Sequence, residues 1–204
     1  MEIKICGLTR PEDAALAAEL GADYSGVVLY PGSPRGVGVE QAAAIFAAAG
    51  SALRVGVFVR PGIELLDEAV EKAGLNVIQL HGGESYEYIN EVKERFPGCL
   101  VWAARHIADA DEIESALSCP ADRLVLDAAN GGSGMVCDWS LAARVAAARP
   151  VMLAGGLNAG NIAEAVKSIN PFGVDLSSGV ESGKKGIKSH IKLKEIFNIL
   201  REIR

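Results

Sequence analysis

The sequence contains few cysteine, histidine and aromatic residues. Its 204 positions include four cysteines, three histidines and 5% aromatic residues. No two cysteines form a CxxC pair, so the sequence indicates neither a thiol–disulfide motif nor a cysteine-rich zinc site. The three histidines are far apart in the chain. We therefore expect free thiols and no metal site.

The sequence also lacks a long apolar run and an excess of positive charge. No uninterrupted apolar stretch reaches the roughly 20 residues that a helix needs to cross a bilayer. The first residues, MEIKICGLTR, do not have the composition of a secretion signal. The net charge is −6, which argues against a nucleic-acid-binding surface. We expect a cytoplasmic protein with a small-molecule partner, no nucleic acid and no membrane, acting as a monomer or homodimer.

Half of the residues are apolar, and they recur as short β-branched runs between Ala-, Leu- and Glu-rich stretches of helical period. This alternation is typical of repeated βα units. Eight such units at nearly even spacing predict a single-domain (β/α)₈ TIM barrel over residues 1–204, with an open doubly wound sheet as the alternative. The predicted strands are Ile3–Cys6, Tyr24–Leu29, Leu53–Phe58, Val77–Leu80, Cys99–Ala104, Arg123–Asp127, Val151–Ala154 and Gly173–Leu176.

Several helix ends can be predicted from local sequence. Thr9 and Glu12 have the spacing of a capping box, and Gly21 fits a helix stop. Asn158 and Ser189 are expected to be the N-caps of the seventh and eighth helices.

In a barrel of this kind, functional residues lie at the carboxyl ends of the strands. Gly155 and Gly156 follow the seventh predicted strand, and Ser178 and Gly179 follow the eighth. Small residues let backbone N–H groups approach a phosphate, so these neighbouring loops predict a phosphate site. The alternative is that both are ordinary tight loops.

Three further candidate side chains lie at the end of a predicted strand or in the loop after it. Cys6 and Asp127 would face the same barrel mouth, where a thiol and a carboxyl group can act as base and acid. A nearby helix start would favour the Cys6 thiolate. Arg35, in a proline-stiffened loop, can bind a carboxylate through two hydrogen bonds. The alternatives are a buried packing thiol, a carboxyl group that caps its own loop, and a solvated arginine.

Strand alternation places Lys4 on the same side of its strand as Cys6. In a closed barrel the first and last strands are neighbours, so we expect Lys4 to pair with Asp175 and to help lower the Cys6 pKa. The alternative is that the Lys4 side chain extends out of the bottom of the barrel. His81 is expected to organise its loop. The basic stretch from Gly183 to Lys188 is expected to be a solvated loop.

Seven sequence motifs extend from Lys4 to the final helix: KICGLT, SPR, VGVFV, QLHG, LD followed by GGSG and DW, LAGGLN and VDLSSGVE. In these motifs and their order, the chain resembles the phosphoribosylanthranilate isomerases of tryptophan biosynthesis. The resemblance implies a cofactor-independent Amadori rearrangement of N-(5-phosphoribosyl)anthranilate in a (β/α)₈ barrel.

The resemblance also implies residue roles. Cys6 matches the general base and Asp127 the general acid, while Arg35 matches the residue that holds the anthranilate carboxylate. Gly155, Gly156, Ser178 and Gly179 match the phosphate loops, and we add Asp175 to the substrate-binding candidates.

The sequence departs from the family pattern at Gly36, at Ser133, over Met135–Cys137 and at Ser189, which affects expected substrate contacts more than the reaction. Three other functions stay open: another phosphate-binding barrel enzyme such as a sugar-phosphate epimerase or a thiamin-phosphate-type synthase, a non-catalytic binder, or an isomerase that also accepts the histidine-pathway analogue.

Overall fold

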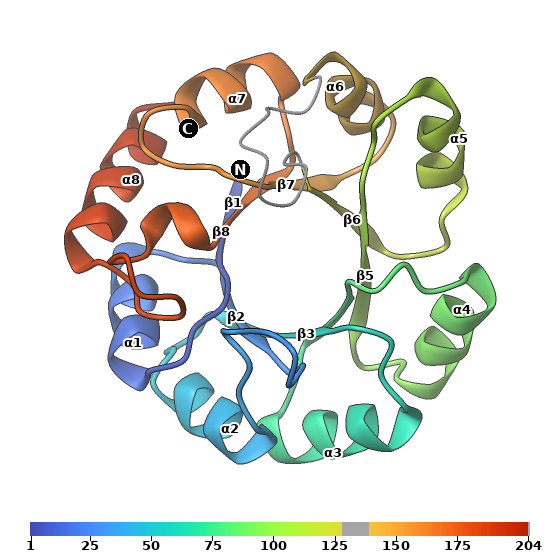
Figure 1. Ribbon diagram of the computed structural model, residues 1–204, viewed down its shortest axis with the longest axis horizontal. Helices are drawn as coiled ribbons and strands as arrows, with labels where there is room; N and C mark the ends of the chain where they lie inside the picture. The colour runs from blue at the N-terminus through green and yellow to red at the C-terminus, as the bar shows by residue number, and fades with distance from the viewer. Residues whose placement is uncertain (128–138, 204) are drawn as a thin grey trace.

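The computed structural model describes residues 1–127 and 139–203. Within them, eight parallel strands form a closed barrel in which each strand pairs with its neighbours in sequence and β1 pairs with β8 (Figure 1). The strands are β1 (Glu2–Ile5), β2 (Tyr24–Val28), β3 (Leu53–Phe58), β4 (Val77–Leu80), β5 (Leu100–Arg105), β6 (Arg123–Asp127), β7 (Val151–Ala154) and β8 (Gly173–Leu176).

The helices form a ring around the barrel, each following its strand (Figure 1). A 3₁₀ turn, η1 (Ser178–Val180), follows β8 before the last helix. The α-helices of the described residues are α1 (Pro11–Leu20), α2 (Val39–Ala47), α3 (Ile63–Ala73), α4 (Tyr86–Arg95), α5 (Ala110–Ser118), α6 (Trp139–Ala148), α7 (Ile162–Ile169) and α8 (His190–Ile203).

The (β/α)₈ fold class is confirmed, and the strand predictions agree with the structure to within one residue at each end. Cys6, Leu29 and Cys99 lie just outside the strands that were predicted to contain them. Glu2 and Arg105 lie inside β1 and β5, one residue beyond the predicted ends. The described part of the chain contains no helix whose length and apolar character would let it cross a membrane.

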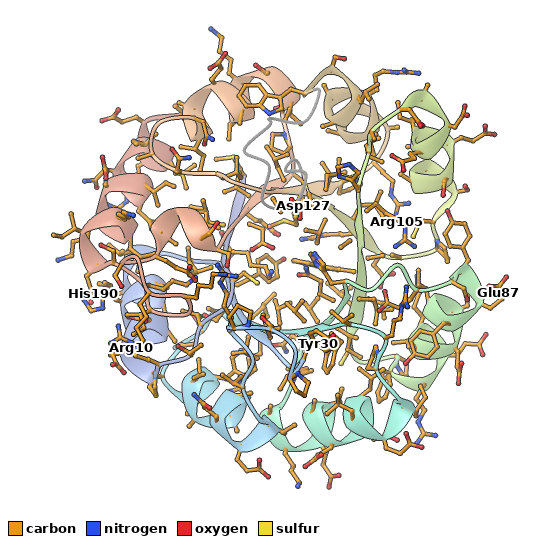
Figure 2. All side chains as sticks on the ribbon, in the orientation of Figure 1. Arg10, Tyr30, Glu87, Arg105, Asp127 and His190 are labelled. Atoms are coloured by element: carbon orange, nitrogen blue, oxygen red, sulfur yellow. The ribbon has the colours of Figure 1, made fainter. Side chains whose placement is uncertain are left out.

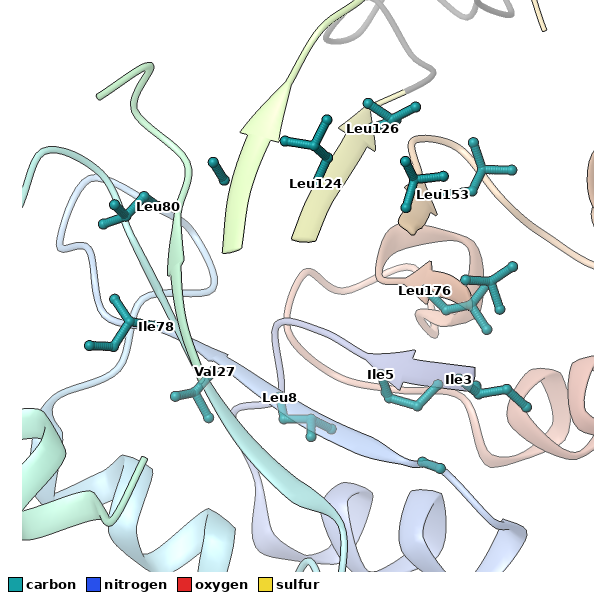
Figure 3. Close-up of a cluster of buried hydrophobic side chains, with 14 of the residues drawn as sticks. Ile3, Ile5, Leu8, Val27, Ile78, Leu80, Leu124, Leu126, Leu153 and Leu176 are labelled. Atoms are coloured by element: carbon teal, nitrogen blue, oxygen red, sulfur yellow. The ribbon is translucent and has the colours of Figure 1, made fainter. Parts of the chain in front are cut away.

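Alternate residues of each strand pack in two separate apolar layers. One layer lies between the strands and the helices and includes Ile3, Ile5, Leu126 and Leu153 (Figure 3). The second fills the barrel interior, where Trp102 packs edge-on against Tyr24 with ring centroids 4.9 Å apart. The barrel is therefore a solid core rather than a pore.

Polar contacts cover the amino-terminal end of this interior. The Tyr24 hydroxyl donates to Glu2 at 2.6 Å, and Arg123 donates to the same carboxylate at 2.6 Å. The Arg123 guanidinium also lies 4.0 Å from the centroid of the Phe172 ring. This end is closed by packing and ion pairing, so access to the interior is from the carboxyl ends of the strands.

Two of the four helix-end predictions are confirmed. Gly21 ends α1 with φ of 101°, a left-handed conformation that glycine adopts readily, and the Ser189 hydroxyl accepts from the Lys192 N–H at the start of α8. The Thr9 capping box is wrong, because Arg10 occupies the N-cap position and the Thr9 hydroxyl donates to the Gly186 carbonyl at 2.7 Å.

Asn158 is not the N-cap of α7. That helix begins at Ile162, and Asn158 instead forms a tight turn in which its side chain accepts from the Gly160 N–H. The turn delays the helix because an Asn side chain bonds readily to the backbone two residues on.

Asp13 joins α1 to the segment that leads into α8. Its buried carboxylate accepts two hydrogen bonds from Arg10, at 2.7 and 3.0 Å, and one each from the Lys188 N–H and the His190 ring. Burial alone would raise the pKa of Asp13, but these bonds outweigh it and hold the pKa below its ordinary value of 3.8. Asp13 therefore stabilises the fold when its carboxyl group is ionised.

We expect Asp13→Asn to lower the free energy of unfolding by about 3 kcal/mol at neutral pH, because it removes a buried, fully bonded charge. Since the folded pKa lies below the unfolded one, this stabilisation is present above the unfolded pKa and disappears as the pH falls through the folded pKa. The stability difference between parent and variant should shrink on acidification. Urea unfolding at a series of pH values measures it.

Glu12→Gln is the matched control, since Glu12 is in the same helical turn but its side chain is 56% exposed. It should leave the unfolding free energy nearly unchanged. Equal effects of the two variants would contradict a specific role for Asp13.

Candidate active site

A cavity of about 500 Å³ opens at the carboxyl ends of the strands. Figure 2 looks into this mouth and shows Asp127 and Tyr30 on opposite sides of it. The cavity is lined by Cys6, Val28, Tyr30, Ser33, Arg35, Val57, Val59, Gln79, His81, Asp127, Ala154, Gly155, Gly156, Leu157, Asp175, Ser177 and Ser178. Of the predicted site residues, all but Gly179 line it.

Cys6 directly follows β1 and is buried at the floor of the cavity. Burial raises the pKa of the Cys6 thiol above its ordinary value, and the Asp175 carboxylate adds to this, while the Lys4 and Lys188 ammonium groups act in the opposite direction. The net direction is opposite to the one we expected from a nearby helix start. The reason is that burial of the thiol outweighs the two cations, and α1 begins only at Pro11.

Lys4 and Asp175 form the expected ion pair. They are direct partners in the β1–β8 register, and the Lys4 Nζ lies 2.7 Å from an Asp175 carboxylate oxygen. Burial would lower the pKa of Lys4, but the Asp175 and Cys6 anions outweigh it and raise the pKa. A permanent positive charge therefore lies beneath the Cys6 thiol. Within the part of the chain that the structure describes, the second Asp175 oxygen is buried without a hydrogen-bond partner.

Asp127 ends β6, separated from β1 by β7 and β8 on the shorter way around the barrel. Its carboxyl group lines the same cavity as Cys6, as the sequence predicted. Ser133 and the Met135–Cys137 departure, by contrast, lie outside the described residues.

Gly155 and Gly156 form the loop after β7, with φ of 87° and 63°. Both conformations are in the left-handed region, which favours glycine. The Asn158 and Asn161 side chains both donate to the Gly156 carbonyl and hold the loop in place. Ser178 opens η1 across from this loop and completes a small, glycine-rich wall.

Gly179 does not line the cavity. A Cβ atom at this position would lie 1.9 Å from the Leu157 carbonyl oxygen. Gly179 therefore allows η1 to pack directly on the loop after β7. It supports the glycine-rich wall through this packing and does not face the cavity.

Arg35 lies at the edge of the cavity and pairs with Glu181. Its Nε donates to one Glu181 oxygen at 2.7 Å and one of its Nη atoms donates to the other at 2.9 Å. Gly36 follows in a position where a Cβ atom would lie 2.5 Å from the Tyr30 carbonyl oxygen. Glycine at position 36 therefore allows the Tyr30–Arg35 loop to fold tightly, which accounts for this departure from the family pattern.

Glu181 and Lys188 were missed by sequence reasoning. Lys188 is 2% exposed, so the prediction of a solvated basic loop is wrong for this residue. Its Nζ donates to the Ser177 carbonyl at 3.1 Å and lies 3.5 Å from Glu181. The apolar Ile187 beside Lys188 was the available sign that this part of the loop returns to the protein.

His81 follows β4 and keeps solvent contact at the cavity rim. Its Nδ1 lies 3.1 Å from the amide nitrogen of buried Gln79. Enclosure by the barrel mouth lowers the pKa of His81, and the Lys4 ammonium adds to this, so the ring is neutral at neutral pH. A hydrogen-bonded neutral ring agrees with the loop-organising role we expected.

A more open depression of about 690 Å³ adjoins the cavity and shares His81 and Asp127 with it. It lacks Cys6, Arg35 and the loop of Gly155 and Gly156, so the smaller cavity is the candidate active site. Among residues 1–127 and 139–203, no three His, Cys, Asp or Glu side chains are grouped as metal ligands.

We expect Lys4→Met to raise the Cys6 pKa further, because it removes the main cation beside the thiol and leaves the Asp175 anion. The pH dependence of Cys6 alkylation by iodoacetamide, measured by peptide mass spectrometry, reports this change.

The paired variant Lys4→Met/Asp175→Asn removes both charges and should raise the Cys6 pKa less than the single variant. It also avoids an unpaired buried carboxylate, which costs about 3–5 kcal/mol of stability. An unchanged Cys6 titration in both variants would exclude an electrostatic influence of Lys4.

The chain matches the family model described as N-(5'phosphoribosyl)anthranilate (PRA) isomerase over residues 3–199. It is 38% identical to N-(5'-phosphoribosyl)anthranilate isomerase of Pelobacter propionicus, with 100% of this chain and 97% of the relative covered. The solved phosphoribosyl anthranilate isomerase of Thermus thermophilus is 41% identical, with a TM-score of 0.89 and 100% of both chains covered.

A further solved isomerase of this kind, 35% identical with a TM-score of 0.87 and 99% of both chains covered, is in complex with reduced 1-(o-carboxyphenylamino)-1-deoxyribulose 5-phosphate. The motifs at the strand ends, the barrel and the full-length matches agree. The chain belongs to the N-(5'-phosphoribosyl)anthranilate isomerase family.

Proposed function

We propose that this chain catalyses the Amadori rearrangement of N-(5'-phosphoribosyl)anthranilate to 1-(2-carboxyphenylamino)-1-deoxyribulose 5-phosphate, a step of tryptophan biosynthesis. Cys6 is the general base and Asp127 the general acid. The observation that carries this assignment is that the two residues line one cavity from strands on different sides of the barrel. A sugar placed between them can receive a proton from one side and lose one to the other.

The phosphate of the substrate binds at the wall formed by Gly155, Gly156 and Ser178. The two glycines carry no side chain that would keep a phosphate from the backbone, and positive φ at both allows successive N–H groups to turn toward one anion. The relative crystallised with a reduced product analogue binds a ligand that carries such a phosphate.

The reaction begins at the ribose ring oxygen. Asp127 donates a proton to this oxygen as the C1–O bond breaks, and the nitrogen lone pair forms the C1=N bond of a Schiff base. The ring is then open, and the Asp127 carboxylate is left ionised. This is general acid catalysis, for which a carboxyl group at the cavity wall is suited.

Cys6 completes the rearrangement. Its thiolate removes the proton from C2, the electron pair forms the C1=C2 bond, and the C=N electrons return to nitrogen to give an enolamine. The enolamine then becomes the ketone. Because burial disfavours the thiolate, the Lys4 and Lys188 cations that oppose this effect are part of the catalytic arrangement.

Arg35 binds the carboxylate on the aromatic ring of the substrate. It lies at the cavity edge, with its guanidinium within reach of a ligand in the mouth. Asp175 supports the site through its ion pair with Lys4, and its second oxygen is buried without a hydrogen-bond partner among the described residues.

We also propose that the protein is cytoplasmic and acts as a monomer or homodimer on a free phosphorylated substrate. A related isomerase from Thermotoga maritima, 36% identical, is described as dimeric.

Cys6→Ala and Asp127→Asn should each lower kcat by about 10²-fold or more, since each removes a proton-transfer group. The assay is the loss of anthranilate-type fluorescence with freshly generated phosphoribosylanthranilate. Cys99→Ala and Asp67→Asn are matched controls outside the cavity and should keep parental rates.

No turnover by a folded parent would contradict the isomerase and favour a phosphate-binding protein without activity. Turnover that survives in either Cys6→Ala or Asp127→Asn would contradict the assignment of that residue.

A further inference from the structure

Glu181 lies behind Arg35 and fixes the orientation of its guanidinium. The two Glu181 oxygens receive the Nε–H and one Nη–H of Arg35 at 2.7 and 2.9 Å. A guanidinium has five N–H donors in a rigid plane, and this pairing uses the side edge of the plane. The outer edge, with one N–H from each Nη atom, is left for a second partner, and among the described residues the structure gives Nη1 none.

The carboxylate of Glu181 is itself firmly held. It is buried, accepts from the Gly186 N–H at 2.9 Å and lies 3.5 Å from the Lys188 ammonium. Because these partners come from the segment between η1 and α8, Glu181 is anchored independently of Arg35. The Glu181 side chain is therefore held in place, and the longer Arg35 side chain packs against it.

The aliphatic stem of Arg35 is fixed by a second contact. A Cβ atom at Gly7 would lie 2.5 Å from Arg35 Cδ, so the stem passes directly over the Gly7 backbone. Gly7 adjoins Cys6, and the stem contact therefore places the guanidinium at a set distance from the catalytic thiol. The Gly7 contact of the aliphatic stem and the Glu181 contact of the guanidinium together leave the Arg35 side chain little conformational freedom.

The charges of this cluster favour an anionic ligand. Burial lowers the pKa of Lys188, and the Glu181 carboxylate acts to raise it. With Lys188 ionised, Arg35 and Lys188 are cations and Glu181 is an anion, so the three groups carry one excess positive charge. Glu181 alone cannot neutralise both cations. A ligand carboxylate on the outer edge of Arg35 would balance the cluster through two charge-assisted hydrogen bonds.

We propose that Glu181 is a positioning residue that holds the side edge of Arg35 and thereby presents its outer edge to the carboxylate on the aromatic ring of the ligand. This inference rests on the proposed function, since it deepens the role given there to Arg35. Glu181 does not touch the ligand. Its effect is to increase the preference of the site for ligands that carry the ring carboxylate.

The test compares the binding of two ligands that do not react, measured by calorimetry on the full chain. The first is reduced 1-(o-carboxyphenylamino)-1-deoxyribulose 5-phosphate, and the second is the same molecule without the ring carboxylate. Glu181→Gln should weaken binding of the first by about 10- to 100-fold, the usual effect of losing hydrogen bonds to a charged group, and leave the second within about twofold.

A double-mutant cycle shows whether Glu181 acts through Arg35. Glu181→Gln/Arg35→Ala should bind the carboxylate ligand no more weakly than Arg35→Ala alone, because the positioning has no effect once the arginine is gone. Glu181→Asp keeps the charge with a shorter arm and should give an intermediate loss. If Glu181→Gln does not fold, Glu181→Asp replaces it in the binding test.

Thr9→Val is the matched control for loosening of the loop. The Thr9 hydroxyl donates to the Gly186 carbonyl at 2.7 Å, so this variant weakens the same segment without contacting Arg35. It should preserve the preference for the ring carboxylate.

Equal weakening of both ligands by Glu181→Gln, additivity in the cycle, or the same loss in Thr9→Val would overturn the proposal. These outcomes are independent of turnover. A parent that selects the carboxylate ligand through Glu181 but does not turn over would refute the proposed function and leave this inference in place.

Discussion

The pairing of β1 with β8 is the contact on which the rest of the structure depends. It joins residues about 170 positions apart in the chain and sets Lys4 directly opposite Asp175. Once this register is formed, the two charges meet in the barrel interior at 2.7 Å and satisfy each other. A shift by one residue would point them to opposite faces and leave an unpaired charge in an apolar layer. Closure of the barrel and burial of this pair are therefore one event.

The same closure assembles the cation-rich side of the mouth. Cys6 and Gly7 extend from β1, and the segment after β8 carries Glu181 and Lys188. Arg35 reaches over Gly7 from the loop after β2 to meet Glu181. Positive charge is gathered around the thiol on this side, whereas the Asp127 carboxyl group comes from β6. This separation suits a reaction in which one side of a sugar accepts a proton and the other side loses one.

Much of the fold and part of the site can be predicted from the sequence. Strand positions follow from short apolar runs, because a strand buried on both faces has no polar alternation to obscure its limits. Cys6, Asp127, Gly155, Gly156 and Ser178 are predicted to share one mouth because parallel strands bring their carboxyl ends to the same edge. The Lys4–Asp175 pair follows from strand parity combined with closure. Each of these conclusions needs only local pattern and topology.

The remaining features depend on the path of the loops and on burial. The partner of Arg35, the burial of Lys188 and the packing role of Gly179 are set by how segments after β2, β7 and β8 cross one another. Apart from the apolar Ile187 beside Lys188, no local pattern indicates those crossings. The pKa of Cys6 likewise depends on a balance between desolvation and charges from distant positions. The sequence by itself determined the barrel and the residues at its mouth, since periodicity and chain direction are local properties. The tertiary structure alone decided that Arg35 meets Glu181, that Lys188 is buried and that burial raises the Cys6 pKa, because long-range packing sets both distance and solvent exposure.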